Sequence, residues 1–439
     1  MEKMKTNLLL TLFFFSLIGN AQLLLTKEEA VSLALEHNFG VKIANNTVEI
    51  AENNSDILNS GYLPSLTGNG GANFNIDNTE AEFSNGGSTE LTGAESSRYN
   101  ASVNLNYTLF DGLGRFYNYK RLKEEYQLTE LQARETIENT IVDMMTMYFQ
   151  VANFSQSVSA LEKSLEISRD RLKRAEYQFE YGQDTKLGML NAEVDRNNDS
   201  ISTINMKLEL EKAKRNLNLV IGNSVSSRFE VDTVIVFIVG LEKEELHEKM
   251  LANNVVLLQN QKNIAISEYD IKTGKSGYLP RIGLTGSYGW NKNNNNAASF
   301  VAVSTNTGLS GGLNLTWDIF DGGSTITRVK NAQIALNNQK ILNEQIEKEV
   351  ERNFNNAWDH YQNKVAVYQI EENNILTAFN NFDRTQEKFK MGQVNSLEFR
   401  QAQINYLNAV VSKNQAKYEA KLAEIILLQI SGELLNVVF

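Results

Sequence analysis

The sequence predicts a mixed α/β membrane protein that consists mostly of long coiled-coil α-helical hairpins, with two transmembrane β-hairpins per chain. Three observations predict this fold class. The 439 residues include only two prolines, so almost nothing interrupts the backbone hydrogen bonds of very long helices. Four short runs alternate apolar and polar side chains, as strands do. The same series of motifs occurs twice along the chain.

Composition excludes several classes of protein. The chain has no Cys, which excludes disulfides, thiolate metal sites and Cys nucleophiles. A net charge of −11 without a basic block argues against nucleic acid as a partner. A hydrophobic content of 42% is too high for a disordered chain. Beyond the N-terminus no segment reaches the ~18 consecutive apolar residues of a membrane-spanning helix.

The N-terminus is typical of an export signal over residues 1–21. Lys3 and Lys5 precede an apolar run at residues 8–18, and small residues end the segment at Ala21, where we expect cleavage. A buried N-terminal helix is the alternative. An exported chain without a spanning helix is either soluble outside the cytoplasm or held in a membrane as a β-barrel.

The repeated motifs predict two structural repeats, at residues 22–222 and 223–439. Three motifs recur in the same order: Ser-Gly-Tyr-Leu-Pro at 60–64 and 276–280, Phe-Asp-Gly at 110–112 and 320–322, and Gly-Gln at 182–183 and 392–393. Each repeat is expected to hold a β-hairpin, 64–110 or 280–320, followed by a long helical hairpin, 112–221 or 322–431. Short helices are expected at 26–37, 39–60, 241–252 and 254–275, and a further segment opens the second repeat.

The long helices are predicted from the spacing of glycine and of apolar residues. About 70 residues without Gly or Pro follow each Phe-Asp-Gly, enough for one helix of about 105 Å. Apolar residues step by three and four, as at Phe354, Ala357 and Tyr361, which is the pattern of helices that wrap around each other. Four residues are suited to cap the starts of the return helices: Asp184, Thr185, Asn395 and Ser396.

The strands are predicted from alternation at residues 66–76, 99–109, 282–290 and 309–319. Their lengths suit tilted transmembrane strands, and polar loops at 77–98 and 291–308 join them. Four strands cannot close a membrane barrel, because about eight is the minimum and open edges in lipid are costly. The chain must therefore share a barrel with copies of itself, two giving eight strands and three giving twelve.

In the order and doubling of these motifs the chain resembles the TolC family of outer-membrane efflux proteins. The resemblance covers essentially the whole mature chain. It implies a homotrimer with a 12-stranded β-barrel, an α-helical periplasmic tunnel, and an equatorial belt that includes the strand-like run 228–237. It also implies a passive exit duct of a tripartite efflux or type I secretion system in the outer membrane of a Gram-negative cell. The implied partners are outer membrane lipid, a periplasmic adaptor protein and, through the adaptor, an inner-membrane pump.

The resemblance also implies two sets of site residues. The adaptor-docking tips would be Phe179, Tyr181, Gly182, Gln183, Phe389, Met391, Gly392 and Gln393. A pore constriction is expected at Glu398 and Gln401, where the family pattern has two acids; the alternative is that Glu398 only stabilises its helix N-terminus. The bonds that close the family's entrance are altered, because Phe389 and Val394 face Leu187 and Gly188 at the matching positions. The closed state must then depend on packing or on other bonds.

The sequence gives little support for an enzyme, and no cofactor or metal is expected. His37, His247 and His360 are far apart, and packing or surface roles suit them. Gly274-Lys275-Ser276 lacks the earlier Gly of a phosphate-binding loop, because Tyr269 occupies that position. The alternative function is a secreted coiled-coil structural or adhesive protein, which would not account for four alternating strands.

Overall fold

The computed structural model describes residues 23–84 and 86–437, and its contacts divide them into two units. The first unit comprises Leu131–Leu258 with the described parts of Met1–Thr47 and Gln345–Phe439. The second comprises Val48–Glu130 and Gln259–Glu344. The expected export signal at 1–21 lies outside the described residues.

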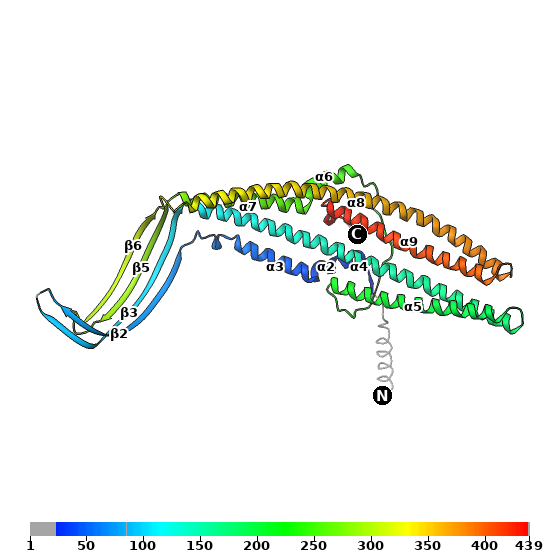
Figure 1. The fold of residues 1–439 in the computed structure, drawn as a ribbon, viewed down its shortest axis with the longest axis horizontal. Coiled ribbons are helices and arrows are strands. Elements are labelled where there is room, and N and C mark those ends of the chain that lie inside the picture. Colours follow the sequence, from blue (N-terminus) through cyan, green and yellow to red (C-terminus); the bar gives the residue numbers. More distant parts are fainter. Residues whose placement is uncertain (1–22, 85, 438–439) are drawn as a thin grey trace, which may run out of the picture. The chain divides into compact units, whose positions relative to one another are not determined.

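The second unit contains a four-stranded antiparallel sheet (Figure 1). Its strands are β2 (Ser65–Glu82), β3 (Ser88–Asp111), β5 (Arg281–Asn294) and β6 (Val303–Thr316). Their order in space, β2-β3-β5-β6, joins strands from the two halves of the sequence, because β3 pairs with β5. Pro64 and Pro280 each stand directly before a strand, where the missing N–H removes no ladder bond.

The strands differ from the predicted ones at their ends. Most of the predicted loop 77–98 is strand, and the other loop is shortened to 295–302. The pairing continues through a bulge after Asp77, where the side-chain oxygen of Asn78 accepts the Gly93 N–H at 2.9 Å. Backbone hydrogen bonds pair strands whatever their side chains are. The polar ends of β2 and β3 therefore lack the apolar alternation from which the strands were predicted. β6 also ends at Thr316 rather than at residue 319.

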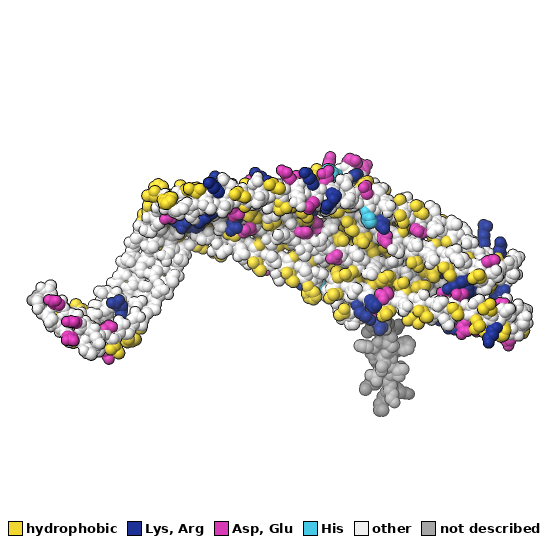
Figure 2. Space-filling model, in the orientation of Figure 1, with side chains coloured by type: hydrophobic (Ala, Val, Ile, Leu, Met, Phe, Trp, Pro, Cys, Tyr) yellow, Lys and Arg dark blue, Asp and Glu magenta, His cyan; other side chains and the backbone are white. Residues whose placement is uncertain are grey.

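The register places the apolar side chains of all four strands on one face of the sheet. Leu66 lies opposite Leu105, and Leu284 lies opposite Leu313. The other face carries small and polar side chains: Thr67, Asn69, Asn104, Asn106, Thr285, Ser287 and Ser310. In Figure 2 the visible face of the sheet is almost entirely white, with little yellow over the strands.

Four long helices form two helical hairpins (Figure 1). They are α4 (Gly114–Glu180) with α5 (Lys186–Val220), and α8 (Ser324–Lys390) with α9 (Ser396–Ile430). Both α4 and α8 have 67 residues, about 100 Å of helix. None of the helices in the described residues contains an apolar stretch of membrane-spanning length.

The shorter elements begin with β1 (Leu23–Leu25), which pairs in parallel with β4 (Phe229–Val231). The short helices are α2 (Lys27–His37), α3 (Phe39–Asn54), α6 (Lys243–Asn253) and α7 (Val255–Lys275). Three 3₁₀ turns complete the list: η1 (Ile57–Asn59), η2 (Ser276–Tyr278) and η3 (Leu434–Asn436). The helix expected at 39–60 therefore ends early, because Asp56 accepts the Leu58 N–H and starts a separate turn.

Only residues 229–231 of the strand-like run 228–237 form a strand. Beyond it, side chains bind the backbone carbonyls that a ladder would use. Lys417 donates to the Thr233 carbonyl at 3.1 Å, Lys27 to Val234 at 3.1 Å, and Lys421 to Val236 at 2.8 Å. These ammonium groups hold the segment extended without a neighbouring strand.

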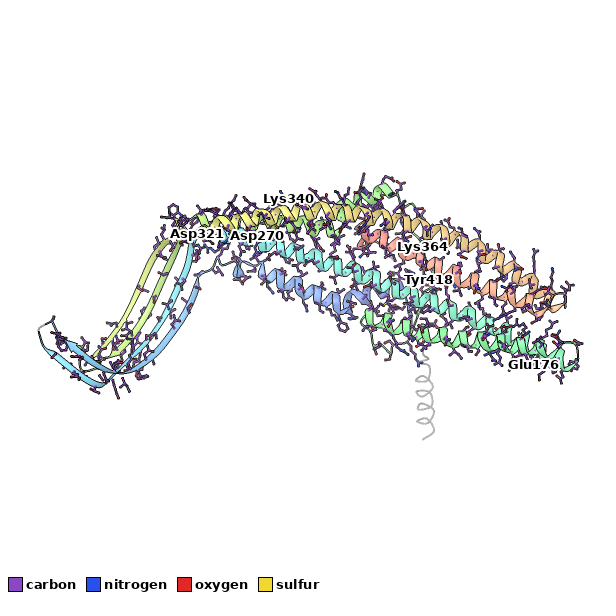
Figure 3. All side chains as sticks on the ribbon, in the orientation of Figure 1. Glu176, Asp270, Asp321, Lys340, Lys364 and Tyr418 are labelled. Atoms are coloured by element: carbon purple, nitrogen blue, oxygen red, sulfur yellow. The ribbon has the colours of Figure 1, made fainter. Side chains whose placement is uncertain are left out.

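The core of the first unit lies where these elements meet the long helices. Tyr148 of α4 is fully buried and donates its hydroxyl to the Leu25 carbonyl at 2.7 Å. Tyr418 of α9, labelled in Figure 3, stacks on Phe149 with the ring centres 5.7 Å apart. A second cluster forms around Phe354 of α8, with Met250 of α6. The first cluster joins α4 to α9 and the second joins α8 to α9, so apolar contacts link the two hairpins of the first unit.

Candidate functional site

The turn between α4 and α5 is built from local backbone bonds. Gly182 has a φ of +71°, a conformation that other residues rarely adopt. The Gln183 N–H reaches back to the Gln178 carbonyl at 2.7 Å, which is the bond that closes a Schellman motif. Thr185 then caps α5 by accepting the Gly188 N–H. The turn is therefore fixed by residues within one short stretch.

The turn between α8 and α9 repeats this arrangement. Gly392 has a φ of +73°, and the Gln393 N–H donates to the Lys388 carbonyl at 2.9 Å. Asn395 caps α9, accepting the Glu398 N–H at 2.9 Å. Because both turns use the same bonds at equivalent positions, the two hairpin ends have the same backbone design.

The predicted tip residues differ in exposure. Tyr181 is 75% exposed and Met391 is 63% exposed, and Phe179 is also exposed. Phe389 is half-buried, since its ring stacks on Phe399 with centres 4.7 Å apart. The Arg174 guanidinium also lies 4.8 Å from the Phe389 ring centre. Phe389 thus holds the second tip together, while Met391 and Leu397 are the apolar side chains exposed there.

Glu398 and Gln401 are both exposed on the first turns of α9. The Glu398 carboxylate accepts a bond from the Asn395 amide at 3.2 Å, which completes a reciprocal cap at the helix start. Gln401 donates to Asn405 at 2.8 Å along the same helix. Within one chain these two residues have local roles.

A buried ionic network joins α4, α5 and α9 behind the tips, and the sequence reasoning missed it. The Arg400 guanidinium of α9 donates twice to the Asp199 carboxylate of α5, each bond 2.7 Å long. Ser168 of α4 also donates to Asp199. Arg171 of α4 pairs with Asp195. The spacing of Asp195 and Asp199, which places them four residues apart on one face of α5, is the sequence feature that could have indicated this network.

Burial shapes the electrostatics of this network. Desolvation lowers the pKa of Arg171, although Asp195 opposes the shift. Desolvation would also lower the pKa of Arg400, but its bonds to Asp199 outweigh that effect and raise it. The Arg400–Asp199 pair is therefore held in its charged form and ties the two helical hairpins together near their ends.

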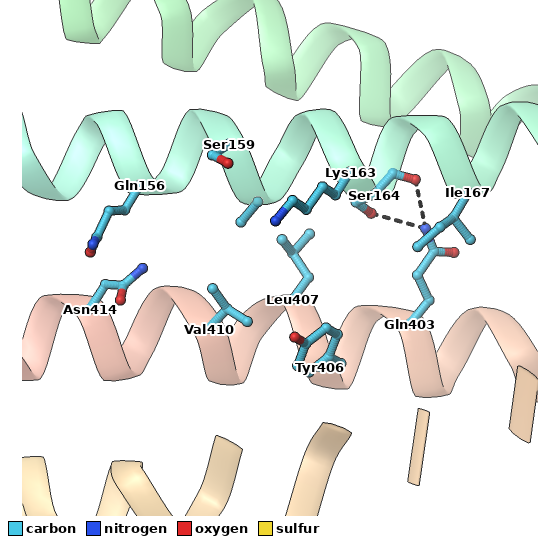
Figure 4. Close-up of a pocket in the computed structure, with 11 residues that line it drawn as sticks. Gln156, Ser159, Lys163, Ser164, Ile167, Gln403, Tyr406, Leu407, Val410 and Asn414 are labelled. Carbon is cyan, nitrogen blue, oxygen red and sulfur yellow. Dashed lines mark hydrogen bonds between the residues drawn. The ribbon is translucent and has the colours of Figure 1, made fainter. Parts of the chain in front are cut away.

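A cavity of about 230 Å³ separates α4 from α9 beside this network (Figure 4). Leu407 and Val410 of α9 line it together with Lys163 of α4. At one end the Gln403 amide donates to the Ser164 carbonyl at 2.8 Å and to its hydroxyl at 2.9 Å. The volume is below the ~300 Å³ at which ligand clefts begin, so the cavity is a packing gap that the Gln403 bonds bridge.

The described residues contain no group of three or more His, Asp or Glu side chains that could hold a metal ion. The His247 ring packs against Phe354 with ring centres 5.4 Å apart, and His37 lies 3.7 Å from Glu36. These contacts suit structural roles.

Comparison with known proteins identifies relatives along most of the chain. A profile described as "Outer membrane efflux protein" matches residues 30–223 and 246–433. The outer membrane efflux protein BepC of Brucella suis is 22% identical over 419 residues, which cover 95% of this chain and 88% of BepC. The outer membrane protein TolC of Vibrio cholerae is 20% identical over 346 residues, 77% of this chain and 78% of TolC.

Solved structures share the fold. The CmeC outer membrane channel of Campylobacter jejuni superposes with a TM-score of 0.77 at 16% identity, covering 93% of this chain and 86% of CmeC. CusC superposes with a TM-score of 0.74 at 16% identity, covering 95% of this chain and 96% of CusC.

Proposed function

The chain belongs to the outer membrane efflux protein family, and from that premise we propose that three copies form the passive exit duct of a tripartite efflux or type I secretion system. The family resemblance read from the repeated motifs is confirmed, and so is the outer membrane as the location. Members of the family are channels, so we assign the chain transport and no catalytic step.

The observation that carries the proposal is the four-stranded sheet. One face is apolar across all strands, as contact with lipid requires, and the other is lined by Asn, Ser, Thr and Gly. Among the described strands, β2 and β6 each have one neighbour, which leaves two long edges unpaired. Unpaired backbone groups in lipid cost several kcal/mol each, so β6 of one copy is proposed to pair with β2 of the next.

Three copies suit a duct better than two. An eight-stranded barrel has an interior just wide enough for its own side chains to fill, whereas more strands leave an open lumen. Twelve strands from three chains would provide such a lumen, with a polar wall. The two repeats, 22–222 and 223–439, would each contribute one β-hairpin to the barrel and one helical hairpin to the periplasmic tunnel after removal of residues 1–21.

The hairpin ends are proposed to dock a periplasmic adaptor, which would connect the tunnel to an inner-membrane pump. Exposed Tyr181 and Met391 beside the two tight turns support this, because apolar side chains at a turn are suited to packing against another helical hairpin. Three copies would also bring three Glu398 carboxylates around one axis at the entrance.

Cysteine cross-linking tests the assembly, and the chain has no native Cys to interfere. Asn104 and Ser287 lie opposite each other on β3 and β5, so a Cys pair there should close within one chain and serve as the control. Cys pairs scanned along β2 and β6 should instead give covalent trimers in outer membranes. Covalent dimers alone would contradict the twelve-stranded barrel. Recovery of the protein in the soluble fraction would favour the secreted coiled-coil alternative.

A further inference from the structure

A basic pocket of about 430 Å³ lies in the first unit, where α5 ends and the chain turns toward β4. Its cationic side chains are Lys214 and Arg215 of α5 and Arg228 of the following loop. The rest of the lining is Glu211, Val225, Ser226, Ser227 and Phe229. In Figure 2 a group of dark blue side chains appears over the region where Figure 1 places the end of α5.

The loop that carries Arg228 is fixed at both ends. Gly222 has a φ of +71°, and a Cβ at this position would come within 2.5 Å of His37. The buried Asn218 side chain donates to the Ser227 carbonyl at 2.9 Å. On the other side Phe229 is buried in the core as the first residue of β4. Arg228 therefore projects from a backbone that needs little ordering when a ligand binds.

The three cations are not neutralised by neighbours. Among the described residues, no carboxylate lies within ion-pair distance of Lys214, Arg215 or Arg228. Nearby lysines of α5 differ, since Lys207 pairs with Glu162 at 2.6 Å and Lys212 with Glu209 at 2.8 Å. With Glu211 as the acid of the lining, the pocket keeps a net charge of about +2 at neutral pH. This stands out in a chain whose net charge is −11.

We propose that this pocket binds a phosphate-class oxyanion. Guanidinium groups bind phosphate oxygens in pairs, and the ammonium and two serine hydroxyls supply further donors. The net charge matches a phosphate dianion better than a carboxylate, which has one charge and two oxygens. The phosphate can come from the free inorganic ion or from a lipid headgroup, for which exposed Val225 would offer an apolar edge. The proposal does not depend on the export function.

Calorimetric titration of the purified full-length protein in detergent tests the site, at a constant ionic strength of about 0.15 M so that general charge screening stays fixed. The probes are inorganic phosphate and short-chain phosphatidic acid, each compared with chloride. Saturable binding of either probe supports the site. Equal affinities indicate free phosphate, and at least tenfold tighter binding of the lipid indicates a headgroup.

Matched variants separate the pocket from overall charge. Arg215→Gln with Arg228→Gln should weaken binding about a hundredfold, roughly tenfold for each guanidinium group whose paired hydrogen bonds to the phosphate are lost. Lys207→Gln with Lys212→Gln removes the same charge outside the pocket and should change the affinity less than about twofold. Arg228→Lys keeps the positive charge but loses the planar guanidinium that donates two parallel bonds. Its affinity should lie between those of the two double variants. Absence of saturable binding by the parent protein, or equal losses in the two double variants, would overturn the proposal.

Discussion

Replacing Arg400 by Leu removes the centre of the buried network that joins the two helical hairpins. The variant loses two 2.7 Å bonds to Asp199 and leaves that carboxylate, whose side chain is 9% exposed, without its main counter-charge. Breaking a buried pair from one side costs about 3–5 kcal/mol. Ser168 still donates to Asp199, so we expect the lower end, about 3 kcal/mol.

Amide hydrogen exchange measures this loss of stability directly at the start of α9. Opening of α9 near its start should become easier by about 3 kcal/mol, which corresponds to amide exchange about 150-fold faster over its first three turns. The matched control is Lys207→Met, because its pair with Glu162 is about half exposed and such surface pairs contribute at most about 1 kcal/mol. The combined Arg400→Leu and Asp199→Leu variant should recover part of the protection, since an apolar replacement of both partners leaves no buried charge.

A change below about fivefold in Arg400→Leu would refute the reasoning, and so would an equal effect of Lys207→Met. Either result would mean that the Arg400–Asp199 pair contributes little to holding the two hairpins together.

Tyr181→Asp or Met391→Asp should abolish export while trimers persist in the membrane, because each places a charge in the proposed adaptor contact; normal export by both would exclude that contact. Glu398→Gln should reduce cation selectivity and block by multivalent cations in single-channel recordings, because three carboxylates would share one axis. Unchanged selectivity and unchanged block would mean that Glu398 only caps its helix. Burial lowers the pKa of Lys417 to about 8, with Lys413 adding to the shift and Asp232 opposing it. Above pH 8 the folded state thus binds fewer protons than the unfolded state, so the free energy of unfolding should rise toward pH 10. Thermal melts should show this rise in the parent protein relative to Lys417→Met. The same dependence of melting temperature on pH in both proteins would exclude this linkage.

The helices, the strands and the hairpin turns were predictable in outline because they are encoded locally. Long helices follow from the scarcity of Gly and Pro, and the tips follow from Gly182 and Gly392 with their capping residues Thr185 and Asn395. Each of these features depends on residues within a few positions of one another, so a sequence pattern is enough to find it. The polar ends of β2 and β3 were missed because backbone pairing leaves no apolar signature there.

What the sequence by itself determined is the repertoire of elements and their duplication, and the tertiary structure decided how the two halves meet. The pairing of β3 with β5 places Val103 opposite Tyr288 and makes one continuous apolar face. The approach of α9 to α5 brings Arg400 to Asp199. These partners are far apart along the chain, and no local periodicity specifies which residues of two packed helices or paired strands face each other. Only the relative placement of whole elements sets that register.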